Sequence, residues 1–100
     1  MARLPEDRFT PAQIKEMLKP LTGWSYDAKN KCIAKEFDRK NFLGSAGFIQ
    51  QIAGIAELAD HHPDLLLSGY KNVKVMLSTH SAKGVTQSDF DLARSIEKIK

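Results

Sequence analysis

The stretch ELADHHPDLLLSGYKNVKVMLSTH, residues 57–80, contains all three histidines of the chain and a change in hydrophobic pattern. Pro63 disfavours helical backbone at the residue before it, so a preceding helix must end near residues 61–62. An apolar run at 65–67 is followed by a Ser-Gly pair that permits a turn, and residues 73–79 then alternate as in a strand. Strands joined by a short turn pair antiparallel, so the stretch predicts a helix followed by a hairpin.

The first part of the chain predicts the same order. Thr10 and Pro11 are typical of a helix start, and apolar residues recur behind them at helical spacing. Two short strands, 24–26 and 32–37, then flank a polar turn. Lys35 interrupts the alternation of the second strand, because it shares a face with apolar neighbours.

Residues 38–59 form the longest helical pattern. Their apolar positions cover roughly half of the helix circumference, which is wider than contact with one sheet face requires. The excess indicates either a second surface for a neighbouring subunit or a broad core helix, and the sequence leaves both open. Gly44, Gly47 and Gly54 cost helix stability and would permit close backbone approach.

Thr86 begins the last helix, which carries apolar residues through 99. The predicted order is therefore helix, two strands, helix, two strands, helix. This order predicts an α+β fold with a four-stranded antiparallel sheet and helices packed on one face. A chain of 100 residues is one domain's worth, so we expect a single domain over residues 1–100.

Composition excludes several classes of protein. The chain is 42% hydrophobic and 27% charged, as in soluble globular proteins, and no apolar run approaches the roughly 20 residues of a membrane helix. Its 15 basic residues are scattered, which argues against direct nucleic-acid binding. Cys32 is the only cysteine, which excludes an internal disulfide and a cysteine-rich zinc site. The amino terminus lacks the apolar core of a secretory signal, so we expect a cytoplasmic protein.

The histidines offer proton-transfer chemistry near neutral pH. Glu57 precedes His61 by four residues and shares its face if the helix persists, so this carboxylate can fix the ring tautomer; Asp60 is a second candidate. His80 stands at the end of the predicted strand, where folding can bring it opposite the pair. Two imidazoles facing one substrate can act together as acid and base, as the elimination of water requires.

Other interpretations compete with this one. Adjacent histidines at a helix end can interact with the helix dipole or lie in solvent, and His80 can hydrogen-bond to a loop. Three histidines and carboxylates can also bind zinc. Adjacent residues rarely present both rings to one ion, however, and no HxH or HxxxH spacing is present. Residue chemistry alone therefore leaves a functional histidine site open.

A family resemblance adds to this reading. The spacings of seven residues, with the neighbouring LSTH and Gly23-Trp24 segments, resemble the signature of the pterin-4a-carbinolamine dehydratase family. These positions are Glu57, His61-His62-Pro63, Tyr70, His80 and Asp89. The resemblance covers nearly the whole chain. It implies dehydration of a 4a-hydroxytetrahydropterin to the quinonoid dihydropterin, which recycles tetrahydrobiopterin; the enzyme is a hydro-lyase that needs no metal or organic cofactor.

The resemblance also implies roles for individual residues. His61 and His80 are the leading acid and base candidates, with His62 assisting. The implied substrate-binding residues are Glu57, Asp60, His61, His62, Ser78, Thr79, His80 and Ser81. Asp89 falls at the third position of the last helix, where we favour a role in supporting the helix start. A homo-oligomer, either a dimer or the family's tetramer, built through the 38–59 helix would explain the excess apolar arc.

One departure and two rival functions accompany the resemblance. Many family members carry an aromatic residue where this chain has Leu65, so ring stacking from that position is lost. A protein-interaction module is the strongest rival, because the family includes an animal member that stabilises dimers of a homeodomain transcription factor and acts as a coactivator. A relative serving another pterin pathway, such as molybdopterin or folate metabolism, is the third possibility.

Overall fold

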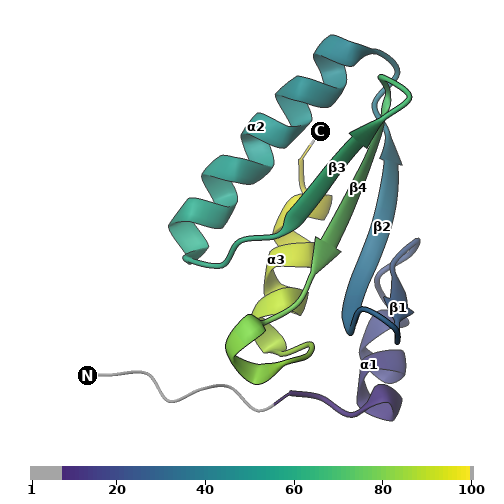
Figure 1. Ribbon diagram of the computed structural model, residues 1–100, viewed down its shortest axis with the longest axis vertical. Helices are drawn as coiled ribbons and strands as arrows, with labels where there is room; N and C mark the ends of the chain where they lie inside the picture. Colours follow the sequence, from purple (N-terminus) through teal and green to yellow (C-terminus); the bar gives the residue numbers. More distant parts are fainter. Residues whose placement is uncertain (1–7, 100) are drawn as a thin grey trace.

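The computed structural model describes residues 8–99 and contains the predicted order of elements (Figure 1). The elements are α1 (Pro11–Leu18), β1 (Ser25–Asp27), β2 (Cys32–Asp38), α2 (Phe42–Ala59), β3 (Asp64–Ser68), β4 (Asn72–Leu77), the short 3-10 helix η1 (His80–Ala82) and α3 (Gln87–Glu97). The helix start predicted at Thr10 is confirmed, since its side chain and that of Gln13 form a reciprocal capping box.

The four strands form one antiparallel sheet in the order β1-β2-β4-β3. Alternate residues of β4, beginning with Val73, point into the core, where they meet side chains from all three helices, including Ile14, Phe48 and Phe90. On that face α2 and α3 contact one another (Figure 1). The α+β fold with helices on one sheet face is therefore confirmed.

The long helix begins later than predicted, at Phe42 rather than at residue 38. Asp38 is still the last residue of β2, and Lys40 has a φ of 75°, which is incompatible with a helix. The Asn41 side chain then caps the helix by accepting a hydrogen bond from the Gly44 amide at 2.7 Å.

The last strand ends earlier than predicted, at Leu77 rather than at residue 79. Thr79 instead pairs with Gly84 in an isolated bridge, and His80 opens the 3-10 turn between them. His80 is therefore part of the turn that follows β4, and its side chain is exposed.

Lys35, the polar residue on the apolar face of β2, reaches the edge of the core. Its ammonium donates to Glu97 Oε2 at 2.8 Å and to the Thr22 carbonyl at 3.0 Å. The same ammonium lies 4.7 Å from the centroid of the Phe37 ring. Glu97 also accepts from the indole of buried Trp24 at 3.1 Å. These contacts explain how the strand tolerates the interruption.

The outer side of α2 remains apolar. Its inward residues Phe48, Ile52 and Ala56 are buried, whereas the outward Leu43 and Leu58 are 82% and 93% exposed. The apolar arc of this helix is therefore wider than the sheet-facing side of one chain. Among the helices of residues 8–99, none is both long and apolar enough to cross a membrane.

Candidate functional site

The histidine pair begins where α2 ends. Asp60 adopts the left-handed conformation, with φ 51° and ψ 43°, and its amide donates to the carbonyls of Ala56 and Glu57. This C-cap reverses the chain immediately before the pair. The side chains of His61 and His62, which follow Asp60, consequently lie in different surroundings.

His61 is held by a buried carboxylate from α3. Its Nε2 lies 2.5 Å from Asp89 Oδ1, and the His61 side chain is only 16% exposed while Asp89 is fully buried. The pairing joins residues 28 positions apart, so the tertiary fold positions this ring.

Asp89 organises three segments at once. Its second oxygen, Oδ2, accepts from the Thr79 hydroxyl and from the Thr86 amide, each at 2.9 Å. The Thr86 contact confirms the predicted role at the start of the last helix, and the His61 contact adds a second role. Since an ionised carboxylate can only accept, His61 donates to it from Nε2, and Nδ1 is the ring nitrogen that does not contact Asp89.

His62 is held by an exposed carboxylate. Its Nε2 lies 2.8 Å from Glu57 Oε1, and the two side chains are 59% and 77% exposed. The prediction that Glu57 orients His61 was wrong, because the helix ends at Ala59 and the chain reverses before the four-residue spacing is completed. Asp60 caps the helix end, and the carboxylates paired with the two rings are Asp89 and Glu57.

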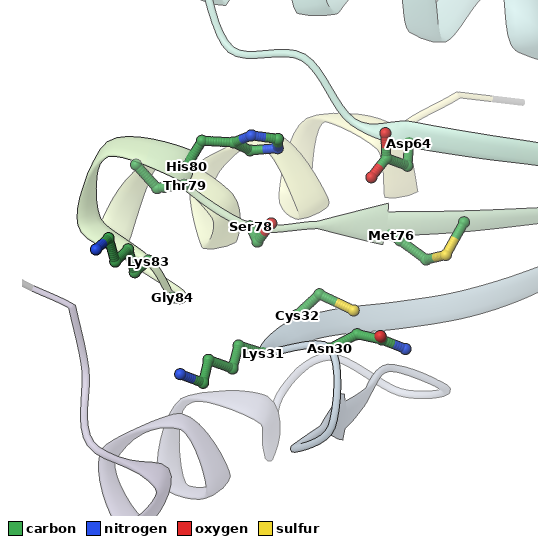
Figure 2. A pocket seen from close by; sticks show the side chains of 10 residues that line it. All are labelled: Asn30, Lys31, Cys32, Asp64, Met76, Ser78, Thr79, His80, Lys83 and Gly84. Atoms are coloured by element: carbon green, nitrogen blue, oxygen red, sulfur yellow. The ribbon is translucent and has the colours of Figure 1, made fainter.

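His80 lies in the wall of a cavity of about 690 Å³ at the end of β4 (Figure 2). Of the predicted substrate-binding residues, Ser78 and Thr79 join it there. Figure 2 shows the His80 ring extending above β4 toward the side of the cavity where Asp64 lies. The lining consists of Asn30, Lys31, Cys32, Asp64, Met76, Ser78, Thr79, His80, Lys83 and Gly84.

The other predicted residues lie outside this lining. His61 lines a smaller cavity of about 200 Å³ beside the end of α2 and the α3 residues Ser88 and Leu92. In the isolated chain the expected shared cleft is therefore divided, because His80 lines the larger cavity and His61 lines the smaller one, while His62 is in the lining of neither. The two cavities are connected through Thr79, which lines the larger cavity and donates to Asp89. Ser81 is exposed on η1.

Sequence reasoning missed the part of the cavity built by the β1–β2 hairpin. β2 pairs with β4 so that Ile33 faces Leu77, which brings Cys32 close to Ser78. Burial raises the pKa of the Cys32 thiol, and the Asp27 carboxylate adds to that rise. The alternation of residues 73–79 was the available signal, because it assigns Met76 and Ser78 to the sheet face away from the core.

Leu65, the departure from the family pattern, packs against the hydrophobic core. Its neighbour Asp64 points to the opposite sheet face and lines the cavity. Within residues 8–99 there is no group of three histidine, cysteine, aspartate or glutamate side chains placed to hold a metal ion.

Comparisons with known proteins agree with this fold. The sequence pattern of the family described as "Pterin 4 alpha carbinolamine dehydratase" matches residues 7–99. Proteins of Sulfolobus acidocaldarius (47% identical, 88% of this chain and 93% of the relative) and Nostoc punctiforme (41% identical, 92% and 96%) are named "Putative pterin-4-alpha-carbinolamine dehydratase". A crystal structure of a "transcriptional coactivator/pterin dehydratase" from Brucella melitensis is 37% identical and superposes with a TM-score of 0.84, covering 91% of this chain and 96% of its own. The chain belongs to the pterin-4a-carbinolamine dehydratase family.

Proposed function

We propose that this protein is a hydro-lyase that converts 4a-hydroxytetrahydropterin to the quinonoid dihydropterin, recycling tetrahydrobiopterin without a metal or organic cofactor. The observation that carries the proposal is the buried Asp89 carboxylate, which pairs with His61 and also binds Thr79 next to His80. A fully buried carboxylate is costly unless several donors satisfy it, and here it holds a histidine ring in one tautomer.

The reaction requires two proton movements. The C–O bond at the carbinolamine carbon breaks, the hydroxyl leaves as water with a proton from an acid, and the neighbouring ring nitrogen loses its proton to a base. The nitrogen electron pair released in this way forms the new C=N bond. Each acid or base typically contributes ~10² to 10⁴ in rate, so two groups are needed for a large acceleration.

The surroundings of the rings suggest which histidine performs which step. Asp89 stabilises the imidazolium that forms when His61 Nδ1 takes a proton, as a buried carboxylate does for a general base. His80 lies in the larger cavity beside Ser78 and Thr79, with its ring exposed. We assign proton removal to His61 and proton delivery to His80, with the pterin bound near Thr79 and His62 assisting from its pair with Glu57.

The substrate contacts follow from the same placement. Ser78 offers its hydroxyl in the cavity wall to the polar edge of the pterin, and Thr79, whose hydroxyl is bonded to Asp89 and Thr86, lines the same wall. Glu57, Asp60 and Ser81 are exposed around the helix end and the 3-10 turn. We place these three at the rim of the bound pterin.

The decisive experiment follows the decay of a hydroxylase-generated 4a-hydroxytetrahydropterin by ultraviolet absorbance. We expect wild-type protein to accelerate the decay and His61→Ala or His80→Ala to reduce that acceleration by ~10²-fold or more. Lys15→Ala, an exposed change on α1, serves as the control, and circular dichroism verifies folding of each variant. Equal decay with and without wild-type protein would exclude the dehydratase.

The exposed apolar face of α2 supports self-association through this helix into a dimer or tetramer. Leu43 and Leu58 are the most exposed large apolar residues of the described chain, and a second copy of the same helix would bury them. Light scattering of wild type and of Leu58→Asp tests this: we expect an oligomer that the substitution dissociates.

A monomeric wild type would instead favour the second candidate, a protein-interaction module that offers this face to another protein. The same two exposed leucines are the observation in its favour. The Brucella structure carries both descriptions, coactivator and pterin dehydratase.

A further inference from the structure

The large cavity has an uneven charge distribution. Asp64 lies at the end formed by β3, whereas Lys31 and Lys83 line the opposite end. Figure 2 shows the two lysine side chains extending toward the same side of the cavity, away from Asp64. The two lysines come from different turns, the β1–β2 hairpin and the residue after η1.

A third cation joins them at the boundary of a neighbouring cavity. This second cavity, of about 190 Å³, shares Lys31, Lys83 and Gly84 with the large one and adds Arg8. Arg8 packs closely on Gly84, where a Cβ would lie 3.1 Å from the arginine Cδ. Glycine at position 84 therefore allows the arginine to lie against the cavity wall.

Among residues 8–99, no acidic side chain lines the second cavity, and neither Lys31 nor Lys83 forms an ion pair. Lys35, by contrast, is paired with Glu97. Like charges lining a concave surface raise the local potential and attract an anion.

The location of the cations relates them to the proposed reaction. A ligand that contacts His80 and Thr79 occupies the same cavity as Lys31 and Lys83, and about 690 Å³ lies within the usual range for small-molecule sites. Lysine binds phosphate and carboxylate groups as a point charge, while arginine can bind them with two parallel hydrogen bonds.

We propose that Arg8, Lys31 and Lys83 form an anion subsite that receives a phosphate or carboxylate on the side chain of the bound pterin. The substrate class is then a 4a-hydroxypterin with an anionic substituent remote from the reacting carbon. This assignment rests on the proposed function for the identity of the ring, while the charge of the substituent follows from the three cations.

Binding of stable oxidised pterins tests the subsite without requiring catalysis. Three fluorescent ligands are titrated: 6-hydroxymethylpterin, its phosphate ester, and a pterin carrying glutamate at the same position. We expect wild-type protein to bind at least one anionic ligand roughly tenfold more tightly than the neutral ligand, and Lys31→Gln/Lys83→Gln to remove that preference. The control is Lys15→Gln/Lys98→Gln, which changes the net charge equally at exposed positions elsewhere.

The two anionic ligands distinguish the two sources of charge. Preference for the ester assigns the subsite to phosphate, and preference for the glutamate conjugate assigns it to carboxylate. Equal affinity for all three ligands, or equal loss of preference in the control variant, would overturn the subsite. Decay assays with a neutral carbinolamine separate the two hypotheses. If the protein accelerates the decay but binds neutral and anionic pterins equally, only the anion subsite is wrong. If the protein prefers anionic pterins but does not accelerate the decay, only the proposed reaction is wrong.

Discussion

His61 and His62 are neighbours in sequence with opposite surroundings. His61 pairs with a fully buried carboxylate of α3, whereas His62 pairs with an exposed carboxylate of α2, the helix that ends just before it. The distances, 2.5 Å and 2.8 Å, are similar, so the comparison isolates the effect of burial. A buried ionic hydrogen bond is expensive to break, because the remaining partner loses both water and its neighbour, while an exposed one is replaced by solvent.

The largest expected effect comes from the buried partner. Asp89→Ala leaves the His61 ring, the Thr79 hydroxyl and the Thr86 amide without their shared acceptor. We expect the free energy of unfolding, measured by urea denaturation, to fall by about 3–5 kcal/mol. Asp91→Ala, an exposed position on the same helix, should change it by less than about 0.5 kcal/mol. Similar losses of unfolding free energy in the two variants would show that the buried carboxylate does not contribute more than an exposed one.

The next effect concerns one of the donors to the same carboxylate. Thr79→Val preserves the shape of the side chain but removes the hydroxyl that donates to Asp89 Oδ2 and that also bonds the Thr86 hydroxyl at 2.7 Å. Because hydrogen bonds to charged groups contribute about 1.5–3 kcal/mol, we expect a stability loss in that range. Ser78→Ala is the control, since it removes a hydroxyl from the adjacent residue, which lines the cavity. If only Ser78→Ala lowered the free energy of unfolding, the hydrogen bond from Thr79 to Asp89 would not contribute to stability.

The exposed pair should respond weakly. Glu57→Gln removes the charge beside His62 but leaves both groups in water, so the expected stability change is about 0.2–1 kcal/mol. Salt screens such exposed pairs, and the difference from wild type should shrink further in 1 M sodium chloride, where the Debye length is about 3 Å. Urea denaturation at low and high salt measures both values. If Glu57→Gln lowered the free energy of unfolding as much as Asp89→Ala does, the difference in exposure would not explain how the two histidine pairs contribute to stability.

The fold was largely predictable because its signals are local. Capping residues at Thr10, the proline after the histidine pair and the alternation of residues 73–79 each act within a few positions along the chain. Element boundaries were less accurate where a single backbone conformation decided them. Lys40 ends the extended segment with a positive φ, and Thr79 leaves the strand to pair with Gly84.

The site was less predictable because its partners are distant in sequence. The four-residue spacing predicted a contact between Glu57 and His61. Asp60 adopts the left-handed conformation, however, which reverses the chain, and His61 pairs with Asp89 instead. Similarly, Lys31 reaches the cavity only through the pairing of β2 with β4. Sequence identified Asp89 as a helix-start residue, and only the tertiary structure added its contact with His61.

The smallest effect extends the contrast between buried and exposed groups to Cys32. Burial raises the pKa of this thiol, with the Asp27 charge adding to the rise, so the unfolded chain loses its thiol proton at lower pH than the folded chain. The corresponding stabilisation is complete below the unfolded pKa of about 8.5 and is lost as pH rises through the folded value. We therefore expect the stability difference between wild type and Cys32→Ala, measured by urea denaturation, to be constant from pH 6 to 8 and to narrow above about pH 8.5. The packing lost with the sulfur does not titrate, so a difference that stays constant through pH 10 would show that the thiol ionises equally easily in both states.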